Sequence, residues 1–285
     1  MLMFSCSELK RDNPYDPSSD NYGGITYKGT LFVPSDIEMK DMAVSGSSIV
    51  LGAVKEGTGG CIVKIPAAGG VPEIFGAGGT GTGMFTSITS VTADSAGNVY
   101  ASDSQHIIQK LSPAGVFTSW PLNYITGADT TYITASGTRV YATNNIDRRL
   151  CAYLSSDGSV ADSAVLSFTA YGEFVPGRIF AAGNYIYVSN TLDGRVVARF
   201  SQSLSPAGVY RHAAPLVDCA AAGGSVQFLS AQSVYRADEN LSVIQKWGDY
   251  GEGPGRILNG RAIAYYPASM YIYIADGVTI KIFGN

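Results

Sequence analysis

One repeating unit limits what this chain can fold into more than any other feature. The unit is an apolar strand, a turn containing Gly or Asn, a strand of the type Val-Tyr-x-x-Asp/Asn, and a further apolar strand. The units recur about every 40–50 residues, which is the length of one four-stranded propeller blade. Six units therefore predict six blades. The second strands of these units lie at residues 98–103, 139–144, 185–190 and 271–276, with weaker copies at 48–51 and 225–229.

The composition agrees with an all-β chain. Gly contributes 34 of the 285 residues, and aromatic residues make up 11%. Gly is suited to turns, whereas aromatic and β-branched residues are suited to strands. No segment has the apolar period of an amphipathic helix, so we expect almost no helix. A β-sandwich would also hold many short strands, but a sandwich does not repeat one unit six times.

The sixth unit is incomplete. It supplies three strands, near residues 261–267, 270–276 and 278–284. A blade of three strands would leave a sheet edge unpaired. The strand-like segment 25–33 precedes the first complete blade and can provide the missing outer strand. We therefore expect residues 25–285 to form a six-bladed β-propeller of four-stranded antiparallel blades, closed by the pairing of residues near 26–34 with 278–284.

The loops between blades resemble those of NHL-repeat propellers. Residues 247–256, Trp-Gly-Asp-Tyr-Gly-Glu-Gly-Pro-Gly-Arg, form a Gly-rich segment that precedes Ala-Ile-Ala at 262–264 and Ile-Ala-Asp at 274–276. A second such segment spans residues 171–178. The similarity extends over roughly residues 25–285 and is clear in four blades. It implies an NHL-like propeller fold, and a fold of this kind does not by itself imply an activity.

A short polar residue follows the second strand in four of the units, namely Asp103, Asn144, Asn190 and Asp276. Side chains of this type accept backbone N–H bonds and fix the turn that follows. In the aligned loops 144–149 and 190–195, an Arg can pair with the carboxylate of the same loop. We expect these loops to lie together on one face of the disc.

The first 24 residues differ from the repeats. Apolar residues ending in Ser5-Cys6 resemble the lipobox of bacterial lipoprotein signals, and the polar segment that follows resembles a tether. The resemblance implies a lipid on Cys6 and a place in the bacterial cell envelope, in the periplasm or at the surface. The alternative is a plain disordered tail, because residues 6–24 are polar and turn-rich. In both cases, we expect residues 1–24 to lie outside the propeller.

The sequence offers few motifs for chemistry. The four Cys have no C-x-x-C spacing, and Cys61, Cys151 and Cys219 lie in apolar runs that are typical of buried strands. The glycines at 76–81 fit G-x-G-x-x-G, but residues with β-branched side chains follow instead of a helix. We therefore interpret this segment as a loop between blades.

Carboxylates at the axis are a further possibility for chemistry. Asp41, Asp94, Asp129 and Asp218 lie in or near the predicted inner strands, and Ca²⁺ sites in six-bladed lactonases use oxygen ligands at that place. The four residues do not match a family motif. The two His residues, His106 and His212, fall in different blades. We therefore expect no metal, no cofactor and no catalytic residue.

The net charge of −4 and the absence of a Lys/Arg block argue against nucleic-acid binding. We expect a monomeric, non-catalytic interaction propeller that binds a protein or carbohydrate and touches a membrane only through a lipid anchor. An axial-channel enzyme, such as a lactonase, hydrolase or lyase, and a structural module of a surface assembly are the alternatives. The candidate binding residues, all in loops expected on one face, are Asp147, Arg148, Tyr171, Phe174, Arg178, Asn190, Asp193, Trp247, Tyr250 and Arg256.

Overall fold

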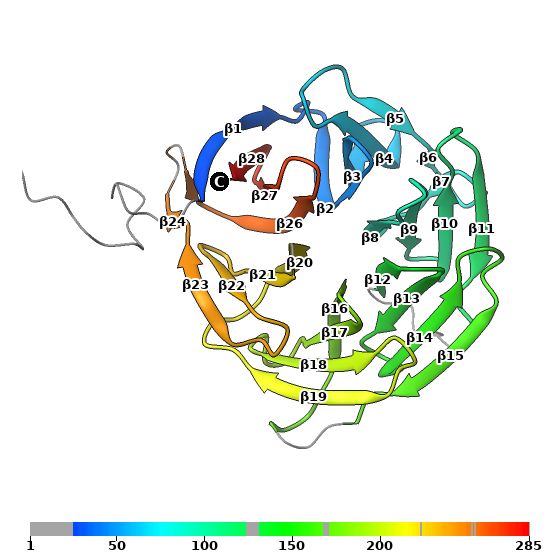
Figure 1. The fold of residues 1–285 in the computed structure, drawn as a ribbon. Helices are drawn as coiled ribbons and strands as arrows, with labels where there is room; N and C mark the ends of the chain where they lie inside the picture. Colours follow the sequence, from blue (N-terminus) through cyan, green and yellow to red (C-terminus); the bar gives the residue numbers. More distant parts are fainter. Residues whose placement is uncertain are drawn as a thin grey trace, which may run out of the picture.

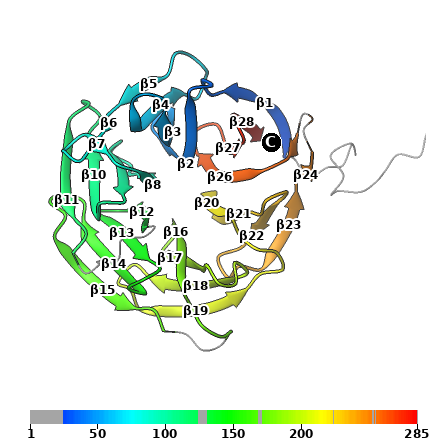
Figure 2. The same cartoon turned by 180° about the vertical axis from the view of Figure 1, so that it is seen from behind.

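Six antiparallel β-sheets form a ring around a central axis (Figure 1), and Figure 2 shows the same ring from behind. The computed structural model describes residues 25–123, 131–167, 171–222, 224–251, 253 and 255–284. Within these residues every regular element is a strand. The six-bladed propeller that the repeats predict is therefore confirmed. No helix in this part of the chain has the length and hydropathy needed to cross a membrane.

The first three blades follow the order of the chain. Blade 1 holds β2 (Ile37–Ser45), β3 (Ser48–Lys55), β4 (Gly59–Pro66) and β5 (Glu73–Phe75), and the short strands β6 (Ala77–Gly78) and β7 (Met84–Phe85) join its sheet. Blade 2 holds β8 (Ile88–Ala93), β9 (Val99–Asp103), β10 (Ile107–Leu111) and β11 (Phe117–Pro121). Blade 3 holds β12 (Thr131–Ser136), β13 (Arg139–Asn144), β14 (Arg149–Leu154) and β15 (Val160–Val165).

The last three blades complete the ring. Blade 4 holds β16 (Pro176–Ala182), β17 (Tyr185–Asn190), β18 (Val196–Ser201) and β19 (Pro206–Arg211). Blade 5 holds β20 (Asp218–Ala222), β21 (Ser225–Leu229), β22 (Val234–Ala237) and β23 (Val243–Trp247). Blade 6 holds β26 (Gly260–Tyr266), β27 (Tyr271–Asp276), β28 (Thr279–Gly284) and β1 (Thr26–Phe32). A small parallel pair, β24 (Asp249–Tyr250) and β25 (Arg256–Ile257), lies between blades 5 and 6.

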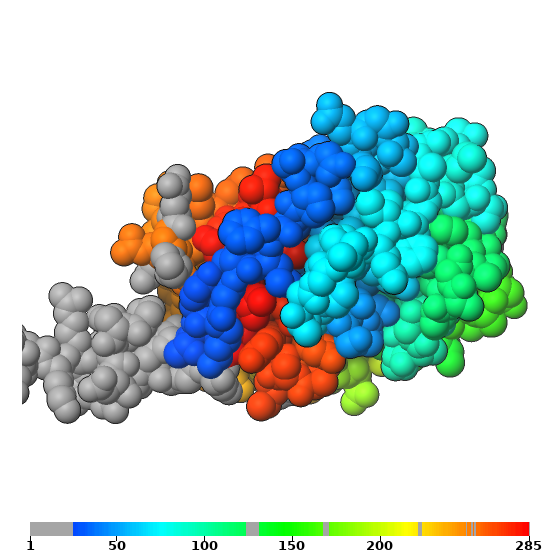
Figure 3. Space-filling model, turned by 90° about the horizontal axis from the view of Figure 1, so that it is seen from above, coloured from blue at the N-terminus to red at the C-terminus, as the bar shows by residue number. Residues whose placement is uncertain are grey.

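The predicted closure of the ring is confirmed. β1 pairs antiparallel with β28, from Thr26 opposite Gly284 to Phe32 opposite Thr279. In the space-filling view of Figure 3, the blue residues of β1 lie against red residues near the C-terminus. Blade 6 thus takes its outer strand from the other end of the chain and leaves no unpaired third strand.

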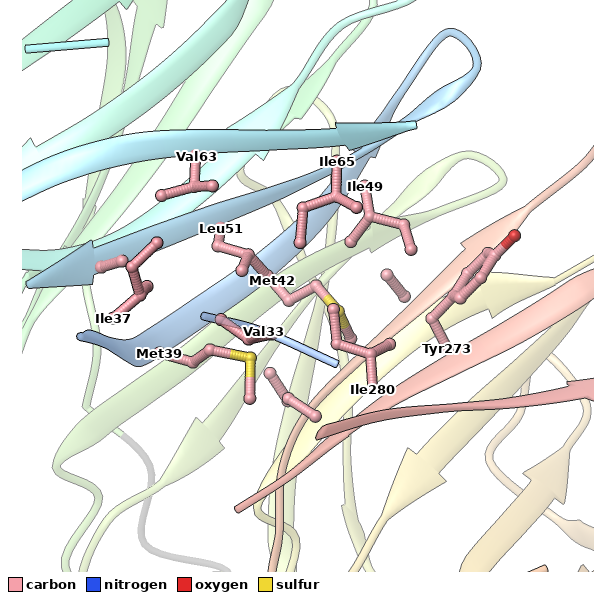
Figure 4. Packing of buried hydrophobic residues seen from close by; sticks show 14 of the residues in the cluster. Val33, Ile37, Met39, Met42, Ile49, Leu51, Val63, Ile65, Tyr273 and Ile280 are labelled. Atoms are coloured by element: carbon pink, nitrogen blue, oxygen red, sulfur yellow. The ribbon is translucent and has the colours of Figure 1, made fainter. Parts of the chain in front are cut away.

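The hydrophobic core lies between the blades. Six buried clusters occur, one at each interface between neighbouring blades. Figure 4 shows the cluster between blades 1 and 6, which contains Leu51 and Val63 of blade 1 together with Tyr273 and Ile280 of blade 6. This arrangement follows from the sequence, because each central strand is apolar on both faces and must be covered by a neighbour.

The tyrosine of the repeat adds hydrogen bonds between blades. The Tyr141 hydroxyl donates to the carbonyl of Gln202, at 2.9 Å, in the next blade. The Tyr187 hydroxyl donates to the carbonyl of Glu239, at 3.0 Å, again in the next blade. Both rings are fully buried. The repeated Val-Tyr therefore supplies apolar packing together with a polar bond at its tip.

The antiparallel blades give the disc two different faces. The loops that join second to third strands, and the crossovers that lead from one blade to the next, emerge on the same face, which we call the crossover face. The hairpin turns that join first to second and third to fourth strands emerge on the opposite face, which we call the turn face. The inner strands β2, β8, β12, β16, β20 and β26 surround the axis between these faces (Figure 1).

Candidate functional site

The polar residues after the second strands hold the loops of the crossover face, as predicted. Asn190 Oδ1 accepts the backbone N–H groups of Leu192 and Val175, each at 3.0 Å. Asp276 accepts the N–H groups of Leu258 and Asn259. Asp103 in blade 2 makes the same kind of contact with Thr86 and Gln105. In blades 2 and 4, one side chain thus joins its own loop to the crossover that enters the blade, whereas Asp276 holds the entering crossover of blade 6.

Several predicted binding residues lie on the crossover face. Tyr171 is 44% exposed and Tyr250 is 58% exposed, while Arg148 and Arg256 are also exposed. Asp147 is half-buried, and Asn190 is buried as the loop cap described above. The Arg148 guanidinium pairs with Glu173 from the following crossover. Asp193 pairs with Arg211 of β19 at 2.9 Å, and not with the Arg of its own loop as expected.

Besides the buried cap Asn190, three of the ten residues are not exposed on that face. Phe174 is buried in the cluster between blades 3 and 4, and Trp247 is buried in the cluster between blades 5 and 6. The Trp247 indole donates to Gln227 Oε1 at 3.3 Å. An aromatic residue in a crossover can turn inward or outward, and these two turn inward. Arg178 lies in the inner strand β16 and lines the axial cavity. The expectation of one shared exposed surface is wrong for these three residues.

The remaining loops of blades 3 and 4 form one bonded unit, which we call the blade 3–4 sector and define as residues 144–149, 171–175 and 190–196. Arg148 of the first loop pairs with Glu173 of the second. Asn190 of the third loop donates to the carbonyl of Glu173 at 2.8 Å. Within the sector the apolar side chains of Ile146 and Leu192 are 56% and 62% exposed, and Tyr171 is exposed as well. The sector therefore presents apolar side chains and ion pairs on loops that are held in place.

A charged cluster lies on the axis. Asp41 of β2, Arg178 of β16 and Asp218 of β20 come from blades 1, 4 and 5. Arg178 Nη1 donates to Asp41 Oδ1 at 2.5 Å and lies 3.8 Å from Asp218 Oδ1. The guanidinium also lies over the Tyr132 ring of blade 3, at 5.0 Å from its centroid. Four inner strands are thus joined through one arginine.

The two carboxylates of the axial cluster also bind backbone groups. Asp41 Oδ2 accepts the N–H of Val91 at 2.8 Å, and Asp218 Oδ2 accepts the N–H of Ile263 at 2.9 Å. Each bond reaches the inner strand of the next blade. The axial cluster therefore has a structural role, because buried charges are stable only when they are paired and hydrogen-bonded.

The electrostatics of the cluster centre on Asp218. Burial raises the pKa of the Asp218 carboxyl to about 7, while Arg178 opposes this shift and Asp41 adds to it. Burial disfavours the charged form of Arg178, but the two carboxylates together hold its pKa above the ordinary value. The axis thus holds a permanent cation beside a carboxyl group that changes its charge near neutral pH.

The cluster forms the floor of a cavity of about 210 Å³ on the axis. All six inner strands line the cavity, each with the residues that run from the level of the cluster toward the C-terminal end of the strand. Seven of the lining residues are alanines. Asp41 and Asp218 at the floor are buried, whereas Ala221 near the end of β20 is exposed. The inner strands run from the crossover face to the turn face, so the cavity opens at the turn face.

The other candidate residues for chemistry do not converge. His212 is buried against Phe228 and Tyr235, and burial lowers its pKa although the Ala214 backbone opposes this shift. Asp94 caps the turn before β9, and Asp129 lies outside the described residues. Among the residues that the structure describes, no three His, Cys, Asp or Glu side chains could jointly hold a metal ion.

The buried cysteines and the glycine-rich segment have the structural roles expected of them. Cys61, Cys151 and Cys219 are buried and free. The segment 76–81 connects blade 1 to blade 2, and no helix follows it. Cys6, the predicted lipid site, lies outside the described residues.

Comparisons with known proteins show the fold. No known protein family and no curated protein matches the sequence. A streptogramin B lyase structure is similar with a TM-score of 0.67 and 14% identity, over 93% of this chain and 99% of that one. Virginiamycin B lyase from Staphylococcus aureus, with quinupristin, gives 0.64 and 13%, over 92% and 99%. The WD40 repeats of RRP9 give 0.63 and 10%, over 91% and 98%. The chain is a β-propeller whose structural neighbours include both a lyase and a WD40 protein.

Proposed function

We propose that this chain is a non-catalytic interaction propeller that binds a protein partner through the blade 3–4 sector. The exposure of Ile146, Tyr171 and Leu192 on mutually bonded loops is the observation that carries the proposal. Exposed apolar residues beside arginine and tyrosine are typical of protein interfaces. Loops that are already fixed lose little conformational entropy on binding, which favours affinity.

The chemistry of the sector favours a protein over a carbohydrate. Ile146 and Leu192 are aliphatic and offer no hydrogen bond to a sugar hydroxyl. They can be desolvated by an apolar partner surface, while Arg148–Glu173 and Asp193–Arg211 supply a polar rim. The NHL-like sequence of the loops supports the same class of function by resemblance alone.

The sector can be tested with two matched pairs of substitutions. We expect Ile146→Asp with Leu192→Asp to weaken partner capture at least about tenfold, a loss of about 1.4 kcal/mol. Val71→Asp with Val116→Asp, at exposed positions on the turn face, is the control and should leave capture unchanged. Both pairs should melt within a few degrees of the parent, because exposed substitutions cost little stability. Equal partner capture by the Ile146/Leu192 variant and the Val71/Val116 variant would refute the proposal. Selective binding of a glycan would show that the partner is a carbohydrate and not a protein.

An axial enzyme is the second candidate function. Asp218, with a pKa raised to about 7 in a cavity, has the property that general acid–base catalysis requires. Hydrolysis or elimination with a panel of lactones and cyclic esters, abolished by Asp218→Asn, would favour this candidate. We rank it second because both carboxylates of the cluster are already engaged with Arg178 and with backbone N–H groups.

We also propose that the protein works in a bacterial cell envelope, anchored by a lipid on Cys6. The lipobox-like residues before Cys6 support this proposal. Detergent phase partition and mass spectrometry of the protein from its native host provide the test. We expect Cys6→Ser to move the protein to the aqueous phase and Ser7→Ala to leave it in the detergent phase. An unmodified Cys6, or equal partition of both variants, would contradict the proposal.

A further inference from the structure

We propose that the axial cavity is a second binding site, which takes a small aliphatic carboxylate against the free edge of Arg178. This site opens on the turn face, opposite the blade 3–4 sector, and its argument does not depend on the proposed protein partner.

The free edge of Arg178 is the first observation. Among the residues that the structure describes, the guanidinium has one hydrogen-bond acceptor, Asp41, to which Nη1 donates. Its Nε and Nη2 groups donate to none of these residues. Arg178 lines the cavity. A guanidinium presents its N–H groups in a planar fork that matches the two oxygens of a carboxylate. The unused edge is therefore a ready donor pair for such a ligand.

The walls define the rest of the ligand. Alanines from all six blades contribute to the lining, together with Val44, Val91 and Ile179. A volume of about 210 Å³ equals that of roughly seven water molecules, at about 30 Å³ each. A ligand of a few aliphatic carbons with one carboxylate fits these dimensions and this polarity.

Asp218 makes the binding depend on protons. The groups around its carboxyl are Arg178 from β16, Asp41 from β2, the backbone N–H of the adjacent Cys219 and the N–H of Ile263 from β26. Its ladder partner in β21 is the apolar Leu229. Below its pKa of about 7, Asp218 is neutral and can donate a proton to a bound carboxylate. Above that pH it is an anion and repels the ligand, so affinity should fall as pH rises.

The test uses butyrate as the probe, with n-butylammonium and inorganic phosphate as comparisons, in titration calorimetry on the full chain. We expect butyrate to bind at least about tenfold more tightly at pH 5.5 than at pH 8.5. This factor corresponds to a change of one unit in the pKa of Asp218 when butyrate binds. In Asp218→Asn the amide is always neutral, and this pH dependence should disappear. Arg178→Lys keeps a cation beside Asp41 but removes the planar fork, and should weaken butyrate binding at least about tenfold.

Two substitutions that replace an alanine by phenylalanine keep the test decisive if changes at the cluster disturb folding. Ala221 is exposed and lines the cavity, whereas Ala231 is exposed in the loop between β21 and β22. Ala221→Phe should obstruct the cavity and reduce butyrate binding, and Ala231→Phe should not. Absence of saturable butyrate binding, equal binding by the two alanine variants, or preference for n-butylammonium or phosphate would each overturn the proposal.

Discussion

Asp218 begins β20 inside the ring, where its pKa is raised to about 7, first by burial. In the unfolded chain, the same carboxyl titrates near pH 3.9. Between about pH 4 and 7, the folded protein holds a proton that the unfolded chain has released. The free energy of unfolding that Asp218 controls therefore falls as pH rises through this range. The group makes the axis less stable in its ionised form, although Arg178 limits this cost.

Asp218→Asn removes this titration at the residue scale. We expect the variant to lose less stability than the parent between pH 4 and 7, by at least about 1.4 kcal/mol, the equivalent of one pKa unit. Asp193→Asn, which changes a half-buried carboxylate paired with Arg211 far from the axis, is the control and should follow the parent curve. Chemical denaturation at several pH values measures the difference. Parallel curves for the parent and Asp218→Asn would show that the axis does not titrate as described.

The elements were predictable where the repeat fixes them. Apolar strands recur in all six units and a polar residue follows the second strand in four of them, so the blade number and the closing strand β1 could be predicted. The short strands β6 and β7 could not, because they are pairings of two residues in a glycine-rich crossover. Arg178 follows Val175-Pro176-Gly177 and resembles part of a loop. A bulge between Pro176 and Ile179 in β16 instead brings it into the inner strand.

The closing strand allows a test at the element scale. Ile25 and Val33 flank β1 and are buried in the clusters on either side of blade 6. Truncation of residues 1–33 removes both side chains and exposes the edge of β28, which should cost at least about 3 kcal/mol. Truncation of residues 1–24 is the matched control and should leave the melting temperature within a few degrees. Similar melting of the two truncated proteins would show that β1 does not close the ring.

At the scale of the whole molecule, the sequence indicated one functional face, whereas the structure has two candidate sites, the blade 3–4 sector and the axial cavity. Loop residues such as Tyr171 and Tyr250 could be assigned to the crossover face, because the order of strands in a blade determines where loops emerge. The axial cluster could not be assembled, since Asp41 and Arg178 are 137 residues apart and only the closed ring brings them together. The burial of Phe174 and Trp247 depends on packing between blades, which no local pattern reports.

Site-specific photocrosslinking in the native host tests the central claim, that the crossover face binds a protein, most directly. A photoreactive phenylalanine analogue is placed at Leu192 or Ile146 in the blade 3–4 sector, and at Val71 or Val116 on the turn face as controls. All four side chains are more than half exposed, so the analogue should be tolerated equally. The account predicts a discrete protein adduct from positions 192 and 146 and none from 71 and 116. Adducts confined to the turn face, or absent from all four positions, would contradict it.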